Sequence, residues 1–195
     1  MRIEPYREPR AFPEIGVASC FSFLAGASQP EELVVTAHRL GLAGLGIADR
    51  NTVAGVVRAH QAAREAELPY APGARLVFSD ATPDIFAYPR DRAGWGRLCR
   101  LLSRGNLRAT KGSCILTLAD LLEWGEGLNL AMIAPQALGC GQDGDAAAME
   151  AGLADPLHRL REAFGGAVRL AVAPAHDGLD QRRMARAAHL AARCR

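Results

Sequence analysis

Short apolar stretches alternate with amphipathic helical stretches along the chain, and this alternation limits most strongly how the chain can fold. Stretches typical of strands span residues 15–23, 42–48, 70–78, 85–88, 128–134 and 168–173. Stretches typical of helices span residues 30–41, 53–60, 91–102, 116–124, 145–164 and 180–192. The alternation predicts an α/β fold with a mainly parallel sheet covered by helices, either doubly wound or barrel-like.

Two of the expected helices carry start signals. Ser28 can accept a hydrogen bond from first-turn amides, and Pro30 fits the opening turn. Thr117, with Asp120 three residues later, forms the pattern of a capping box. We therefore expect helices to open at these two places.

The composition excludes several classes of protein. The 195 residues, 49% of them hydrophobic, carry a formal net charge of +2, which argues against extensive disorder and against a strong global attraction to nucleic acid. No apolar run reaches the ~18 residues that a membrane span needs, and the charged N-terminus does not match a secretory signal. We expect a cytoplasmic protein with no membrane partner.

Common cofactor and metal motifs are absent from the sequence. No GxGxxG or GxxxxGKS/T pattern follows an expected strand, which weighs against dinucleotide and nucleoside-triphosphate sites. The five cysteines form no CxxC pair, and the five histidines form no His-x-His or HExxH pair. We therefore expect no bound cofactor.

One stretch is strongly basic. Between residues 90 and 111, seven positive charges face the single carboxylate of Asp91. Four of these cations recur at helical spacing and share one helix face: Arg97, Arg100, Arg104 and Arg108. This face is predicted either to contact DNA phosphates or an acidic partner, or to be a solvated surface; no interleaved aromatic residue supports base stacking.

Three segments together resemble a known family: residues 19–28, 46–55 and 72–75. They are similar to the start of the PHP (polymerase and histidinol phosphatase) domain, in the form that opens the error-prone, damage-induced relatives of the bacterial replicative DNA polymerase alpha subunit. Further similar segments follow in the same order: 87–92, 96–102, 111–112 and 116–122. The resemblance runs from about Ile15 to the end of the chain.

The resemblance implies an α/β fold of the PHP type, a distorted (β/α) barrel. It implies an N-terminal extension over residues 1–14 and a PHP-like domain over residues 15–195. Because the family expects further strands after Cys194, we expect this barrel to be incomplete, truncated before its last strand or strands.

The resemblance also locates the family's metal positions, and most of them have changed. The His-x-His pair of the first strand falls on Gly16 and Ala18. The Thr-Asp-His motif reads Ala48–Arg50, and the Gly-x-Glu motif reads Gly73–Arg75. A single carboxylate with two guanidiniums cannot supply the several imidazoles and carboxylates that such a metal centre needs. We therefore expect a degenerate cleft of Gly16, Ala18, Asp49, Arg50 and Arg75 with no metal and no catalytic residue.

Arg50 and Arg75 have two interpretations. They can fill the former metal cleft and bind phosphate or a backbone carbonyl. Alternatively, they pair with Asp49 and close the mouth of the barrel.

The function implied by the resemblance is that of an N-terminal PHP domain in an error-prone DNA polymerase, acting in translesion synthesis and damage-induced mutagenesis, itself structural or docking in role. The polymerase chemistry uses palm carboxylates that this chain lacks, so whether the chain is an enzyme stays open. Expected partners are DNA, weakly and through the parent polymerase, and other polymerase domains or replication and repair proteins. The alternatives are a metal-dependent PHP-type phosphoesterase and a stand-alone interaction module.

Overall fold

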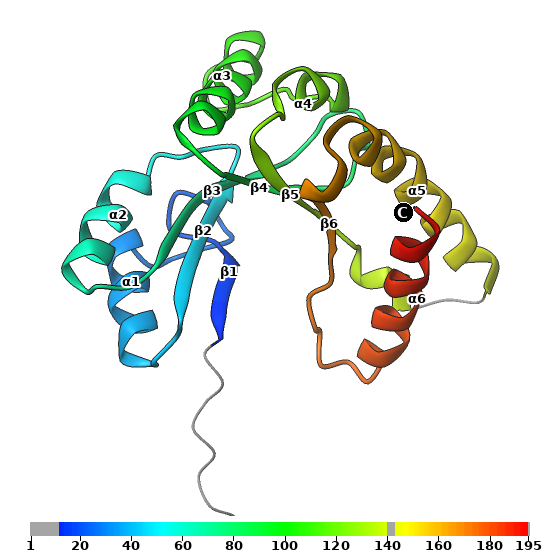
Figure 1. Cartoon of the computed structure of the whole chain (residues 1–195), viewed down its shortest axis with the longest axis horizontal. Helices are drawn as coiled ribbons and strands as arrows, with labels where there is room; N and C mark the ends of the chain where they lie inside the picture. The colour runs from blue at the N-terminus through cyan, green and yellow to red at the C-terminus, as the bar shows by residue number, and fades with distance from the viewer. Residues whose placement is uncertain (1–11, 140–142, 195) are drawn as a thin grey trace, which may run out of the picture. The chain divides into compact units, whose positions relative to one another are not determined.

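A computed structural model describes residues 12–139 and 143–194, so the start of the predicted extension lies outside the described residues. The chain divides into two compact units, Met1–Gly73 and Ala74–Arg195. Figure 1 shows its elements: β1 (Pro13–Val17), α1 (Pro30–Arg39), β2 (Gly44–Arg50), α2 (Val56–Glu65), β3 (Tyr70–Leu76), β4 (Ile85–Pro89), α3 (Arg92–Arg108), α4 (Leu118–Trp124), β5 (Leu128–Ile133), η1 (Gln136–Gly139), α5 (Asp143–Phe164), η2 (Gly165–Ala167), β6 (Val168–Ala171) and α6 (Asp180–Arg193). The predicted α/β class is confirmed.

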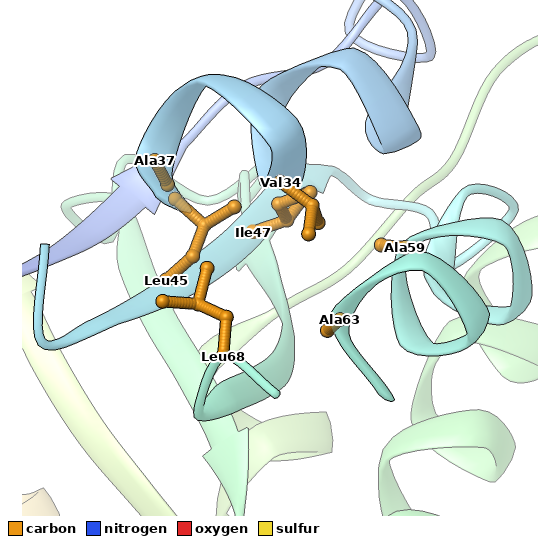
Figure 2. Packing of buried hydrophobic residues seen from close by; sticks show 7 residues of the cluster. All are labelled: Val34, Ala37, Leu45, Ile47, Ala59, Ala63 and Leu68. Carbon is orange, nitrogen blue, oxygen red and sulfur yellow. The ribbon is translucent and has the colours of Figure 1, made fainter. Parts of the chain in front are cut away.

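In the first unit, two helices cover one face of β2. Strand β2 pairs in parallel with β1, and the register shifts at Gly16, which adopts a positive φ of 76°. Figure 2 shows the packing of the seven residues that form this core: Val34, Ala37, Leu45, Ile47, Ala59, Ala63 and Leu68. Alanines on both helices allow the backbones to approach β2 closely, so the strand is buried from Gly44 to Asp49.

The second unit contains a mixed sheet. The end of β3 pairs antiparallel with β4, β4 pairs antiparallel with β5, and β5 pairs in parallel with β6. The expectation of a mainly parallel sheet is therefore wrong here. Only residues 77–84 connect β3 to β4, and a parallel crossover needs a dozen residues or more.

The helix starts follow the sequence signals closely. Thr117 caps α4 in a capping box with Asp120, as predicted. In α1 the cap is Gln29 rather than Ser28, and its box partner is Glu32. Within the described ranges, no helix combines the length and the apolarity needed to cross a membrane.

Two elements differ in length from the stretches that indicate them in the sequence. The first strand was expected to reach residue 23, but β1 ends at Val17 and a loop follows. Helix α3 continues past the apolar stretch that ends at Leu102 and reaches Arg108, as the helical spacing of the four arginines predicts. The early end of β1 accompanies contacts of Ser19 and Ser22 with Asp49, and the end of α3 pairs with Asp120 on the next helix.

Candidate functional site

The first unit contains a buried carboxylate at the end of β2. Asp49 is 2% exposed, and it accepts hydrogen bonds from the Ser19 backbone N–H (2.7 Å), the Ser19 hydroxyl (2.7 Å) and the Ser22 hydroxyl (2.6 Å). The Ser22 hydroxyl in turn accepts a hydrogen bond from the Arg50 backbone N–H at 3.0 Å. Hydroxyl and amide groups therefore compensate this buried charge on both of its oxygens.

The Asp49 network explains why β1 ends early. Ser19 and Ser22 are both buried, and each turns toward Asp49 rather than continuing the alternation of a strand. Residues 19–28 therefore form a closed loop. The backbone N–H of Cys20 donates to the Ser28 carbonyl at 2.9 Å and joins the two ends of this loop.

The two positions that match the family's His-x-His pair, Gly16 and Ala18, have no side-chain atom that could bind a metal. Gly16 lies at the irregularity of β1, and Ala18 immediately precedes the residue that binds Asp49. Arg50 is exposed at the end of β2. Gly16, Ala18, Asp49 and Arg50 thus belong to the first unit, whereas Arg75 belongs to the second.

In the second unit, Arg75 pairs with Asp84. The Arg75 Nη2 atom lies 2.6 Å from Asp84 Oδ2, and Nε donates to the same oxygen at 2.8 Å. The pair lines a cavity of about 400 Å³ whose other walls are mainly apolar and include Ile133 and Leu153.

The five cleft positions do not fit the metal centre of the PHP family that the resemblance implies. Asp49 is the one carboxylate among the five cleft positions, and hydrogen-bond donors already contact both of its oxygens. In the part of the chain that the structure describes, no cluster of three or more His, Cys, Asp or Glu side chains could hold an ion.

The four arginines of α3 face acidic and aromatic groups on and beside α4. Arg108 forms a two-pronged pair with Asp120 at 2.6 and 2.8 Å. Arg104 lies 2.7 Å from Glu123, and Arg97 lies 2.8 Å from Glu126. The guanidinium of Arg100 stacks over the Trp124 ring at 5.5 Å from its centroid.

The sequence contained a signal for this pairing. Asp120 and Glu123 lie on α4 and Glu126 follows in the next turn, so three carboxylates at intervals of three residues complement the arginine face. The pairing of Arg108 with Asp120 also joins the end of α3 to α4. Whether the same arginines contact DNA stays a prediction, and their side chains are between 36% and 42% exposed where an acidic partner is present.

Asp120 links the arginine face to the cap of α4. Burial opposes ionisation of this carboxyl, but hydrogen bonds from Arg108 and Thr117 outweigh the burial and hold the pKa of Asp120 below its usual range. The hydrogen bond with Asp120 correspondingly raises the pKa of Arg108. The pair is therefore ionised throughout the neutral range.

Sequence reasoning missed Arg183, which is fully buried in α6. It pairs with Asp177 at 2.7 Å and with Asp180, and its Nε donates to the Gln136 carbonyl at 2.9 Å. The two carboxylates, six and three residues earlier, were a local signal for this cluster. Arg183 holds the loop before α6 against η1.

Comparison with known proteins identifies the family of this chain. The family model of the PHP domain matches residues 15–163. A solved structure of a protein assigned as a metal-dependent phosphoesterase from Bifidobacterium adolescentis is similar in fold, with a TM-score of 0.58 and 17% identity, and the match covers 94% of this chain and 86% of that one.

Two relatives show the same assignment at higher identity. The error-prone DNA polymerase of Sinorhizobium medicae is 54% identical over 172 residues, 88% of this chain, and that of Mesorhizobium japonicum is 50% identical over 182 residues, 92% of this chain. The matches span 14% and 15% of these two relatives. The chain belongs to the PHP domain family, and over most of its length it is similar to a segment of error-prone DNA polymerases.

Proposed function

We propose that this chain is the PHP domain of an error-prone DNA polymerase that carries out translesion synthesis in damage-induced mutagenesis in the cytoplasm. We propose further that the domain, over residues 15–195, binds no metal and has a structural and docking role. The main support for the metal-free role is the environment of Asp49. Both of its carboxylate oxygens accept hydrogen bonds from Ser19 and Ser22 instead of being open to a metal.

Chemistry at the former cleft supports a structural role. Phosphoester hydrolysis of the PHP type requires a metal that activates water or holds a phosphate oxygen. Gly16 and Ala18 bring no ligand, and the positive charges of Arg50 and Arg75 oppose a cation at their positions. A phosphoesterase, the competing function, would need ligands that these residues do not supply.

Metal content tests the metal-free role directly. The full chain is incubated with Zn²⁺, Mn²⁺ or Fe²⁺, desalted, and analysed for bound metal and for hydrolysis of p-nitrophenyl phosphate. We expect far less than one ion per chain and no hydrolysis. One or more tightly held ions, lost in Asp49→Asn, would overturn the proposal in favour of the phosphoesterase.

The polymerase part of the proposal is tested in the coding DNA downstream of residue 195. An open reading frame with a carboxylate-bearing polymerase body would support it. A stop codon there would contradict it. The isolated chain itself should not extend a primed template, because it lacks the palm carboxylates.

DNA contact by the arginine face is a separate proposal with its own test. If Arg97, Arg100, Arg104 and Arg108 contact phosphates, the logarithm of the DNA affinity should fall linearly with the logarithm of the salt concentration between about 50 and 200 mM, with a slope roughly proportional to the number of phosphates contacted. An absence of retention at the lower salt concentration would leave these side chains with their contacts on and beside α4 as their only role.

A further inference from the structure

Two large apolar side chains project into solvent from the loop of residues 19–28. Phe23 is 86% exposed and Leu24 is 93% exposed. Neighbouring Phe21 is also partly exposed, although its ring packs against Gly55. Exposed single apolar residues are common, but consecutive ones at the tip of a loop form a patch that needs an explanation.

The loop that carries these side chains is firmly held. Asp49 binds Ser19 and Ser22 from below, and the Ala25 and Gly26 backbone N–H groups both donate to the Ser22 carbonyl, at 2.9 and 3.0 Å. Gly26 lies so close to the chain that a Cβ atom there would come within 2.3 Å of the Ser19 carbonyl oxygen. These contacts restrict the backbone of the loop on both sides of the tip, which reduces the entropy lost on binding.

The backbone at the tip is strained for the residue that occupies it. Leu24 has a φ of 62°, a conformation that glycine and asparagine adopt more readily than a branched apolar residue. A loop that served only to turn the chain would favour one of those residues. The leucine side chain is thus explained better by a contact outside the loop than by the turn itself.

The chemistry of the patch specifies its partner. Residues 15–30 contain no charged side chain, so the surface that covers the tip should be apolar and uncharged, and binding should depend little on salt. The chain spans only 14–15% of the length of its relatives, so most of such a polymerase lies outside it. Because most of such a polymerase lies outside this chain, its remaining part is the partner that we expect to cover the tip.

We propose that Phe23 and Leu24 form a preorganised docking tip that inserts into an apolar pocket on the remaining part of an error-prone DNA polymerase. This inference rests on the proposed function and specifies the surface by which the domain would dock. Asp49, the former metal position, acts in it as a positioning residue for the tip.

Hydroxyl-radical labelling read by mass spectrometry tests this inference. The isolated chain is compared with a full-length chimera in which it replaces the matching segment of the Sinorhizobium medicae polymerase. We expect Phe23 and Leu24 to be oxidised at least about fivefold more slowly in the chimera, since a pocket would exclude the radical from side chains that are now exposed. Leu40, which is 67% exposed at the end of α1, is the matched control and should be oxidised equally in both.

A double variant separates docking from folding. In Phe23→Ser/Leu24→Asn, the asparagine suits the positive φ, so the isolated chain should unfold within about 1 °C of the wild type or above it. The chimera with the same change should unfold at a lower temperature than the chimera with the wild-type tip. A lower unfolding temperature of the isolated chain alone would overturn the inference.

The outcomes distinguish this inference from the proposed function. A chimera that extends a primer but leaves Phe23 and Leu24 as reactive as in the isolated chain overturns the docking tip and leaves the proposed function standing. A chimera that cannot extend a primer, or metal-dependent hydrolysis by the isolated chain, contradicts the proposed function. Concentration-dependent protection in the isolated chain would assign the tip to a second copy and also overturn the inference.

Discussion

Replacing Asp49 tests whether this carboxylate acts as a structural group. Asp49→Ala leaves two serine hydroxyls and the Ser19 N–H without the acceptors that they contact at 2.6–2.7 Å. Hydrogen bonds to a charged group contribute about 1.5–3 kcal/mol each, and water entering the cavity recovers part of that energy, so we expect a net loss of about 3–5 kcal/mol. The loop of residues 19–28 should open correspondingly more often.

Hydrogen–deuterium exchange of the Cys20, Ser22, Ala25 and Gly26 amides measures this opening, because each is hydrogen bonded within the loop. The expected loss corresponds to exchange faster by a factor between about 150 and about 5,000 in Asp49→Ala. Both tryptophans lie in the second unit, so fluorescence would not report this change. Exchange within about threefold of the wild type would refute the reasoning, as would the same acceleration in the wild type after EDTA treatment.

Three further predictions concern other parts of the fold. Because folding lowers the pKa of Asp120, the ionised carboxylate stabilises the fold above about pH 4, and this contribution is lost as the pH falls through the pKa of Asp120 in the folded state. The free energy of unfolding in urea should therefore depend less on pH in the acid range for Asp120→Asn than for the wild type. Gly26→Ala should destabilise the chain by at least about 2 kcal/mol in urea unfolding, because its Cβ would meet backbone, whereas Gly152→Ala in α5, where nothing lies within 4 Å, should be neutral or stabilising. Gly16→His should lower stability without adding metal affinity in elemental analysis, because φ at this position is 76°; stoichiometric metal in that variant would contradict our account of the cleft.

Much of the fold could be predicted because local patterns dominate it. The continuous small-apolar run of residues 42–48 became β2, buried on both faces as such a run implies. The capping box of Thr117 and Asp120 was also predicted, since its hydrogen bonds join residues three apart. These features depend on periodicities and on contacts within one turn of helix.

The remaining features depend on pairs that are distant in sequence. Ser19 lies just past the end of the first strand and donates hydrogen bonds to Asp49, thirty residues later. The helical spacing of the arginines predicts α3 as far as Arg108, but the contact of Arg108 with Asp120 joins two separate helices. In the candidate site, the substitution of the metal ligands was readable from sequence, but the new partner of Asp49 was not, because serines in an apolar run carry no signal of what they bind.

The Asp49 network would allow a metal position of the PHP family to take the proposed structural role without a loss of fold. A buried carboxylate is costly unless its charge is compensated, whether by a cation or by hydrogen-bond donors. Here the backbone N–H of Arg50 donates to Ser22, whose hydroxyl donates to Asp49, so one donor strengthens the next. An incoming cation would have to displace these donors and find further ligands where Gly16 and Ala18 offer none. The same bonds that would oppose metal binding hold the loop that projects Phe23 and Leu24, so the proposed metal-free role and the proposed docking tip are compatible in one structure.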